Sequence, residues 1–191
     1  GTEDNRVRKL DYSIQLSKLF YERFIKNEEI TLFSPHDVPG LYDSFGTERF
    51  DDLYLKYEND ESIPKSSVGA QELILDLLKE RAETGRIYIM NIDHCNSHSS
   101  FKDKISMSNL CQEITLPTEP IQHIDDHLGE ISLCILSAVN VGTIRNDDEL
   151  EDLCDLSVRG LEELIDYQQY PVLAAEQATK ARRSLGVGFI G

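Results

Sequence analysis

A nearly continuous apolar run over residues 131–141 is the feature that most constrains the fold of this chain. Such a run, with little alternation of polar and apolar residues, is typical of a parallel strand that is covered on both faces. Parallel strands need crossover connections, which are usually helices, and further strand and helix patterns stand on both sides of this run. The sequence therefore predicts an α/β fold with mostly parallel strands and connecting helices.

Periodicity and turn residues predict the other elements. Helices are expected over residues 6–26, 47–60, 70–84, 146–165 and 171–183, with Gly85 ending the third and Gly186 closing the last. Strands are expected over residues 30–33, 86–92 and 187–190. Residues 93–115 show little periodicity, and irregular segments of such length are usually functional. We see no repeat or linker, so we expect residues 1–191 to be a single fragment of one domain.

The charge and the two ends of the chain exclude some classes of protein. Asp and Glu number 35 against 19 Lys and Arg, a formal net charge of -16. Nucleic-acid binding depends on clustered basic residues, so we expect no nucleic-acid partner. No apolar run approaches the roughly 20 residues that cross a bilayer, so we expect no membrane contact and a cytoplasmic location. The chain does not begin with Met and ends in a strand-like run, so we expect an internal fragment.

The predicted strand at residues 131–141 has two different faces, because alternate side chains of a strand point to opposite sides. One face is apolar and suited to pack under helices. The other is smaller and more polar, with Ser132, Cys134, Leu136, Ala138 and Asn140. A buried face of this kind more often lines a cavity, since buried polar groups need partners. From the strand alone, the simpler interpretation of Cys134 is a small core residue.

A short segment in the irregular region carries a second set of candidate residues. If Asn109-Leu110-Cys111-Gln112-Glu113 is extended, its first, third and fifth side chains project to the same side. An amide, a thiol and a carboxylate placed together could bind a polyol, perform sulfur chemistry and remove a proton. This pattern also occurs by chance, so its meaning depends on the rest of the sequence.

Two histidines beside a cysteine invite a metal interpretation. His94, Cys95 and His98 would need a fourth ligand for zinc, and only His123 and His127 remain as candidates. We favour a polar loop that caps the end of the preceding strand, and we expect no metal site. The four cysteines of the chain lie far apart and form no Cys-x-x-Cys pair, which predicts reduced thiols.

Several segments, in order and at matching spacing, resemble class Ia ribonucleoside-diphosphate reductase large subunits, also called catalytic or alpha subunits. The sequences of these segments are most similar to those of the enzymes of T4-like phages and enterobacteria. The segments are residues 31–43, 84–88, 93–96, 108–114 (Ser-Asn-Leu-Cys-Gln-Glu-Ile), 116–118, 129–134 (Gly-Glu-Ile-Ser-Leu-Cys), 136–142 and 166–168. The resemblance covers essentially the whole chain. It implies part of a ten-stranded α/β barrel in which residues 93–115 form the finger loop.

The resemblance also implies roles for individual residues. Cys111 is similar to the cysteine that becomes a thiyl radical and abstracts the 3′-hydrogen of the ribose. Glu113 is similar to the carboxylate that takes the 3′-hydroxyl proton, and Asn109 to the amide that orients the substrate. Leu110 and Gln112 belong to the same substrate-binding segment. Cys134 is similar to one cysteine of the redox pair, which in the family supplies two electrons and becomes a disulfide.

The implied activity is reduction of ribonucleoside diphosphates to 2′-deoxyribonucleoside diphosphates for DNA synthesis. The implied partners are the substrate, a small subunit with a diiron-tyrosyl radical, thioredoxin or glutaredoxin, and the rest of the large subunit. ATP and dNTP effectors are expected to bind outside this segment, which binds no cofactor directly. The second redox cysteine is expected upstream of Gly1, so the isolated fragment should be inactive. The alternative is a split-chain or remnant module that acts only after assembly with other reductase pieces.

Overall fold

The computed structural model describes residues 10–191 of the chain. They divide into two compact units between Thr115 and Leu116. The elements of the first unit are β1 (Tyr12–Leu16), α1 (Lys18–Lys26), β2 (Glu29–Phe33), α2 (Leu41–Ser44), α3 (Phe50–Glu58), β3 (Lys65–Gly69), α4 (Ala70–Thr84), β4 (Ile87–Asn91) and α5 (Ile92–Ser97). Those of the second are β5 (Ile135–Asn140), the 3₁₀ turn η2 (Val141–Thr143), α6 (Asp147–Tyr167), α7 (Leu173–Arg182) and β6 (Leu185–Ile190).

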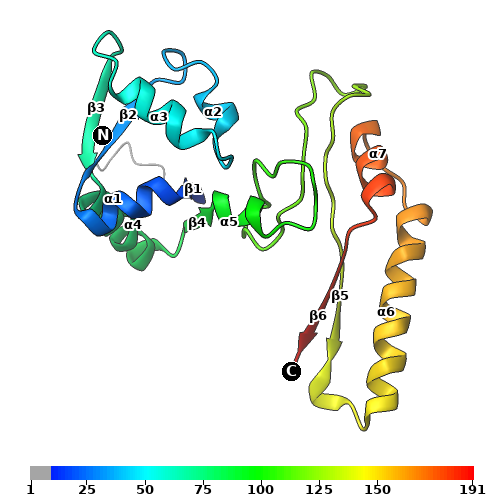
Figure 1. Cartoon of the computed structure of the whole chain (residues 1–191). Helices are drawn as coiled ribbons and strands as arrows, with labels where there is room; N and C mark the ends of the chain where they lie inside the picture. The colour runs from blue at the N-terminus through cyan, green and yellow to red at the C-terminus, as the bar shows by residue number, and fades with distance from the viewer. Residues whose placement is uncertain (1–9) are drawn as a thin grey trace. The chain divides into compact units, whose positions relative to one another are not determined.

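The first unit is organised around the parallel pair β1 and β4, joined by a long crossover that includes α1 and α4 (Figure 1). Register pairs Ser13 with Tyr88 and Gln15 with Met90, so these four side chains share one face of the pair. Strands β2 and β3 form an antiparallel pair, and α2 and α3 lie between them in the sequence. The apolar cluster of Leu16, Phe20 and Ala70 packs α1 and α4 against the strands.

The first predicted helix is wrong over its N-terminal half. We expected a helix over residues 6–26, of which residues 6–9 lie outside the described part of the chain. Strand β1 occupies Tyr12–Leu16, and α1 begins after Ser17, whose hydroxyl accepts a hydrogen bond from the Phe20 N–H at 3.3 Å. Pairing with β4, 75 residues away in sequence, overrides the local helical pattern. The helix ends at Asn27 in the left-handed conformation.

The second unit confirms the predicted parallel strands and the long helix. Strands β5 and β6 pair in parallel, with Ile135 opposite Leu185, and α6 packs against both (Figure 1). The Asn146 side chain accepts a hydrogen bond from the Glu149 N–H at 2.9 Å, which is the predicted helix start. Val139 is buried, but Leu136, on the other face of β5, is 61% exposed. Within this unit only one face of the strand is covered.

Three boundaries in the second unit differ from the predictions. Strand β5 covers only Ile135–Asn140, because residues 131–134 precede its parallel ladder with β6. Helix α7 begins at Leu173 rather than at Pro171. It ends at Arg183, which adopts φ 47° and so takes the capping role that we expected of Gly186. Gly186 lies inside β6 instead.

The predicted elements at residues 30–33, 47–60, 70–84 and 86–92 are confirmed as β2, α3, α4 and β4 to within a few residues. Gly85 ends α4 with φ 68°, as predicted. Among residues 10–191, no helix combines the length and the apolar character needed to cross a membrane.

Candidate active site

The irregular segment predicted at residues 93–115 begins with the short helix α5 and has no regular structure after it. The side chain of Asn96 closes the first half of this segment into a loop. Asn96 accepts a hydrogen bond from the Ile105 N–H at 2.8 Å and donates one to the Ile105 carbonyl at 2.9 Å. Ile105 is 1% exposed and packs with Met90 and Ile92. An amide clamp and an apolar contact therefore fix the base of the loop on β4 and α5.

The second half of the loop ends in a tight turn that contains Cys111. The Gln112 N–H donates to the Asn109 carbonyl at 3.1 Å, which closes a four-residue turn with Cys111 at its third position. The Asn109 side-chain oxygen accepts from the Ile114 N–H at 3.0 Å, and the Ser108 hydroxyl donates to the Ile114 carbonyl at 2.6 Å. The turn is thus closed by both backbone and side-chain hydrogen bonds.

This turn differs from the extended conformation in which the side chains of Asn109, Cys111 and Glu113 would project to the same side. Gln112 has φ 64°, in the left-handed region, and an extended chain does not pass through that conformation. The side-chain alternation of an extended strand therefore does not apply to Asn109, Cys111 and Glu113, and does not show which way their side chains point. All three side chains are exposed in the structure. Their assigned roles stay predictions.

Polar residues of β1 and β4 fasten the loop to one face of the strand pair. The Gln112 side-chain amide donates a hydrogen bond to the Ser13 hydroxyl, and the Gln15 amide donates to the Ser106 carbonyl at 2.9 Å. Tyr88, the register partner of Ser13, lies within hydrogen-bonding range of Cys111. The pKa of Tyr88 is raised, first by its electrostatic interaction with Cys111 and then by desolvation.

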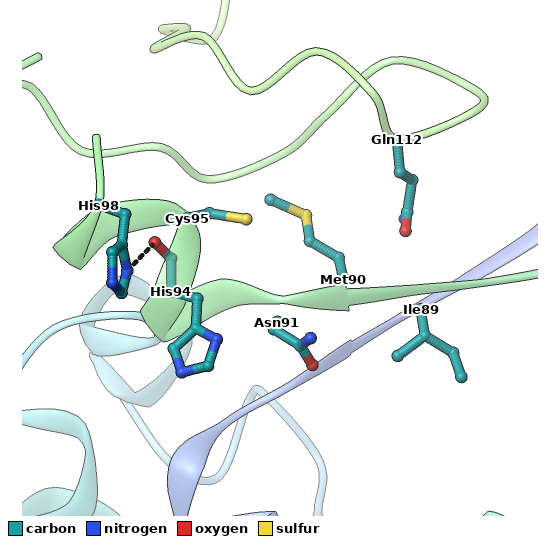
Figure 2. Close-up of a pocket in the computed structure, with 7 residues that line it drawn as sticks. All are labelled: Ile89, Met90, Asn91, His94, Cys95, His98 and Gln112. Carbon is teal, nitrogen blue, oxygen red and sulfur yellow. Dashed lines mark hydrogen bonds between the residues drawn. The ribbon is translucent and has the colours of Figure 1, made fainter. Parts of the chain in front are cut away.

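An open pocket of about 460 Å³ lies beside the loop (Figure 2). Its lining consists of Ile89, Met90, Asn91, His94, Cys95, His98 and Gln112. Neither Cys111 nor Glu113 lines this pocket.

The histidines and the cysteine of this pocket do not form a metal centre in the described residues. The rings of His94 and His98 are 5.5 Å apart and nearly perpendicular, and the His98 ring contacts the His94 carbonyl at 3.2 Å (Figure 2). Burial raises the pKa of the Cys95 thiol, as expected for a sulfur that packs against the core. Across residues 10–191 no group of three or more His, Cys, Asp or Glu side chains could hold a metal ion.

Cys134 is held in a different way, at the entrance to β5. The Ile135 N–H donates to the Ser184 carbonyl at 3.3 Å, so the backbone next to Cys134 is already joined to the segment that leads into β6. A Cβ atom placed on Gly186 would lie 3.2 Å from the Cys134 sulfur and 2.6 Å from a methyl carbon of Leu136. Only a glycine at this position leaves room for both side chains. No disulfide joins any of the four cysteines, all of which lie in the described residues.

Sequence reasoning missed the residues that anchor the loop, which are Ser13, Gln15 and Tyr88. A signal was present, since Ser13 and Gln15 alternate with the larger Tyr12, Ile14 and Leu16 as in a strand with one polar face. The helical interpretation of residues 6–26 concealed it.

A cysteine-bearing loop supported by a pair of parallel strands agrees with the α/β architecture expected from the sequence. The chain belongs to the ribonucleotide reductase family: residues 1–191 match the family model described as "Ribonucleotide reductase, barrel domain".

Three relatives agree with this membership. The chain is 58% identical over 195 residues to the ribonucleoside-diphosphate reductase subunit alpha of Haemophilus influenzae, with 100% of the chain and 26% of that protein covered. It is 55% identical to subunit alpha of reductase 1 of Escherichia coli, with the same coverage. It is 45% identical to subunit alpha of phage T4, with 98% of the chain and 26% of that protein covered. The chain therefore spans about a quarter of the length of these relatives.

Proposed function

We propose that this chain forms the part of a ribonucleoside-diphosphate reductase large subunit that carries the radical-forming thiol, Cys111. The observation that best supports this is the structure of the loop tip. Cys111 is exposed at a closed turn, and the neighbouring Gln112 is hydrogen-bonded to β1. A group that abstracts an atom from a bound substrate must be both accessible and held in a defined position.

In the proposed reaction, a thiyl radical on Cys111 takes the 3′-hydrogen atom of a ribonucleoside diphosphate and becomes an S–H group. Glu113 accepts the 3′-hydroxyl proton, and the 2′-hydroxyl leaves as water after it takes a proton from one thiol of the redox pair. Cys134 and a second thiol outside this chain together supply two electrons and two protons, one proton to the departing water and one to the 2′-carbon, and join as a disulfide. Glu113 returns its proton to the 3′-oxygen. The hydrogen atom then returns from Cys111 to the 3′-carbon, which gives the 2′-deoxyribonucleotide and restores the thiyl radical.

The structure gives Asn109 a second task in this proposal. Its side-chain oxygen accepts the Ile114 N–H, and this bond orients the amide group at the tip of the loop. The amide nitrogen carries two donor hydrogens, which suit the oxygens of a ribose. One side chain thus closes the turn through its oxygen and can orient the substrate through its nitrogen.

The proposed partners are a small subunit with a diiron-tyrosyl radical, thioredoxin or glutaredoxin, and the remainder of the large subunit, with ATP and dNTPs as effectors. The alternative, a split-chain module that works only after assembly, shares the same need for covering elements. Leu136 and Ile190, on one face of β5 and β6, are 61% and 57% exposed within their unit. We therefore expect no turnover from the isolated chain. The cytoplasmic location stays a prediction.

The test replaces Cys111 with Ser in the full-length large subunit, assembled with its small subunit. We expect turnover to fall by more than about 10³-fold, as when a group that takes part in bond-making is removed. Sedimentation velocity should show unchanged assembly. Cys154→Ser, a thiol of α6 that we place outside the reaction, is the matched control and should keep its activity. Turnover of Cys111→Ser within tenfold of the unaltered enzyme would refute the proposal.

A further inference from the structure

Two neighbouring residues of the loop tip meet two residues that are paired across β1 and β4. The Gln112 side chain donates to the hydroxyl of Ser13 on β1, and Cys111 lies beside the hydroxyl of Tyr88 on β4. Ser13 and Tyr88 are register partners, and paired residues of parallel strands present their side chains to the same face. The tip of the loop is therefore docked at two adjacent points on one rigid strand pair.

The two contacts restrain different degrees of freedom. Gln112 is the residue with the left-handed backbone, so its bond to Ser13 fixes the position of the turn itself. That bond does not fix the cysteine side chain, because a Cα–Cβ bond has three staggered rotamers that point the sulfur in different directions. A thiol is a weak donor and a weak acceptor, and a phenol hydroxyl can complement it in either role.

We propose that Tyr88 is the positioning residue for Cys111, and that its hydroxyl selects the rotamer in which the sulfur can reach the 3′-hydrogen of the substrate. This inference rests on the proposed function of Cys111. It assigns Tyr88 no redox step, because Tyr88 acts through the direction of the sulfur and gives up no electron or hydrogen atom.

The test is Tyr88→Phe in the full-length large subunit assembled with its small subunit, because phenylalanine keeps the ring and removes only the hydroxyl. We expect kcat to fall about tenfold, the scale for loss of one hydrogen bond that acts in the transition state, with KM unchanged. A misdirected sulfur slows hydrogen abstraction itself. The isotope effect on kcat/KM with 3′-deuterated substrate should therefore increase, which a general structural defect would not cause.

Two companion variants separate the roles of the anchors. Tyr42→Phe removes the hydroxyl of an exposed tyrosine in the same unit and should change neither kcat nor the isotope effect. Ser13→Ala removes the other anchor, so hydrogen exchange at the loop tip should accelerate in it and stay unchanged in Tyr88→Phe.

An unchanged kcat and isotope effect in Tyr88→Phe would overturn the assignment. A loss of turnover beyond about 10³-fold would overturn it as well, since that scale implies direct participation in the chemistry. Neither outcome bears on the proposed function, which stands or falls with Cys111→Ser.

Discussion

The two cysteines assigned to the reaction are held by opposite structural means. Cys111 lies in a turn without regular structure, and hydrogen bonds from polar side chains determine where the turn sits. Cys134 lies at the first residue before β5, and the neighbouring ladder and the missing side chain of Gly186 determine its place. The first cysteine depends on directional polar contacts, and the second depends on backbone pairing and available volume.

This difference fits the chemistry proposed for each cysteine. A sulfur that removes one particular hydrogen atom needs a defined direction, and hydrogen bonds supply direction. A sulfur that forms a disulfide must approach its partner with correct backbone geometry, which a strand supplies. We therefore expect the two sites to respond to different substitutions, Cys111 to the loss of polar atoms and Cys134 to added volume.

The largest effect in this comparison should come from adding one methyl group beside Cys134. In Gly186→Ala the new carbon would lie 2.6 Å from a Leu136 methyl carbon and 3.2 Å from the Cys134 sulfur. Overpacking of this kind costs about 1–3 kcal/mol, so we expect a lower melting temperature of the full-length subunit and slower oxidation of Cys134. Thermal unfolding and quantification of the Cys134 disulfide by mass spectrometry measure the two effects.

Gly188→Ala is the matched control, because it adds the same methyl group to the same face of β6. There the nearest atom would be the Ser137 carbonyl oxygen at 3.9 Å, an ordinary van der Waals distance. This variant should leave Cys134 oxidation unchanged. Equal effects of the two substitutions would mean that volume beside the sulfur is not what positions Cys134.

A smaller effect should come from Asn109, and two substitutions separate its two tasks. Asn109→Ala removes the acceptor for the Ile114 N–H, which costs about 1 kcal/mol and should accelerate hydrogen exchange at Ile114. Asn109→Asp keeps an acceptor oxygen and removes the amide donor, so the turn should persist while KM for the ribonucleotide increases. If Asn109→Asp also loosened the turn, a single side chain would not be performing the two tasks proposed for it.

The fold was predictable where a pattern is local and only partly where pairing is distant. The start of α6 at Asn146 and the end of α4 at Gly85 depend on a few neighbouring residues, and the structure confirms both. Strand β1 was mistaken for helix because its partner β4 lies far away in sequence. The strand predicted at residues 131–141 was too long, because the apolar pattern begins before Ile135, where the pairing of β5 with β6 begins.

The candidate site shows the same division. Residue types and family resemblance were enough to single out Cys111 and Cys134 as candidates. The contacts that hold them could not be predicted, because Ser13, Tyr88 and Gly186 come from distant segments. The turn that contains Cys111 depends on the φ of 64° at Gln112, and a glutamine gives no sequence signal for a left-handed backbone.

The smallest effect concerns the N-terminus of α6. This helix packs against β5 and β6, the strand pair beside Cys134. Arg145 donates to the Glu149 carboxylate at 2.8 Å and lowers the pKa of that group to about 2, from an ordinary value of 4.5. A depressed carboxyl pKa stabilises the folded helix above the ordinary pKa, and this contribution is lost as the pH falls from 4.5 toward 2.

Glu149→Gln should therefore accelerate hydrogen exchange in the first turn of α6 at neutral pH, and its difference from the unaltered chain should shrink as the pH falls below 4.5. Glu151→Gln, which removes another carboxylate from the same helix, is the control. Alkylation of Cys134 should be unchanged in both variants. Val139 marks the buried face of β5, whereas Leu136 and Cys134 lie on the opposite face. A change in Cys134 reactivity that followed the pH dependence of Glu149 would show that α6, and not only the ladder with β6, determines where this sulfur lies.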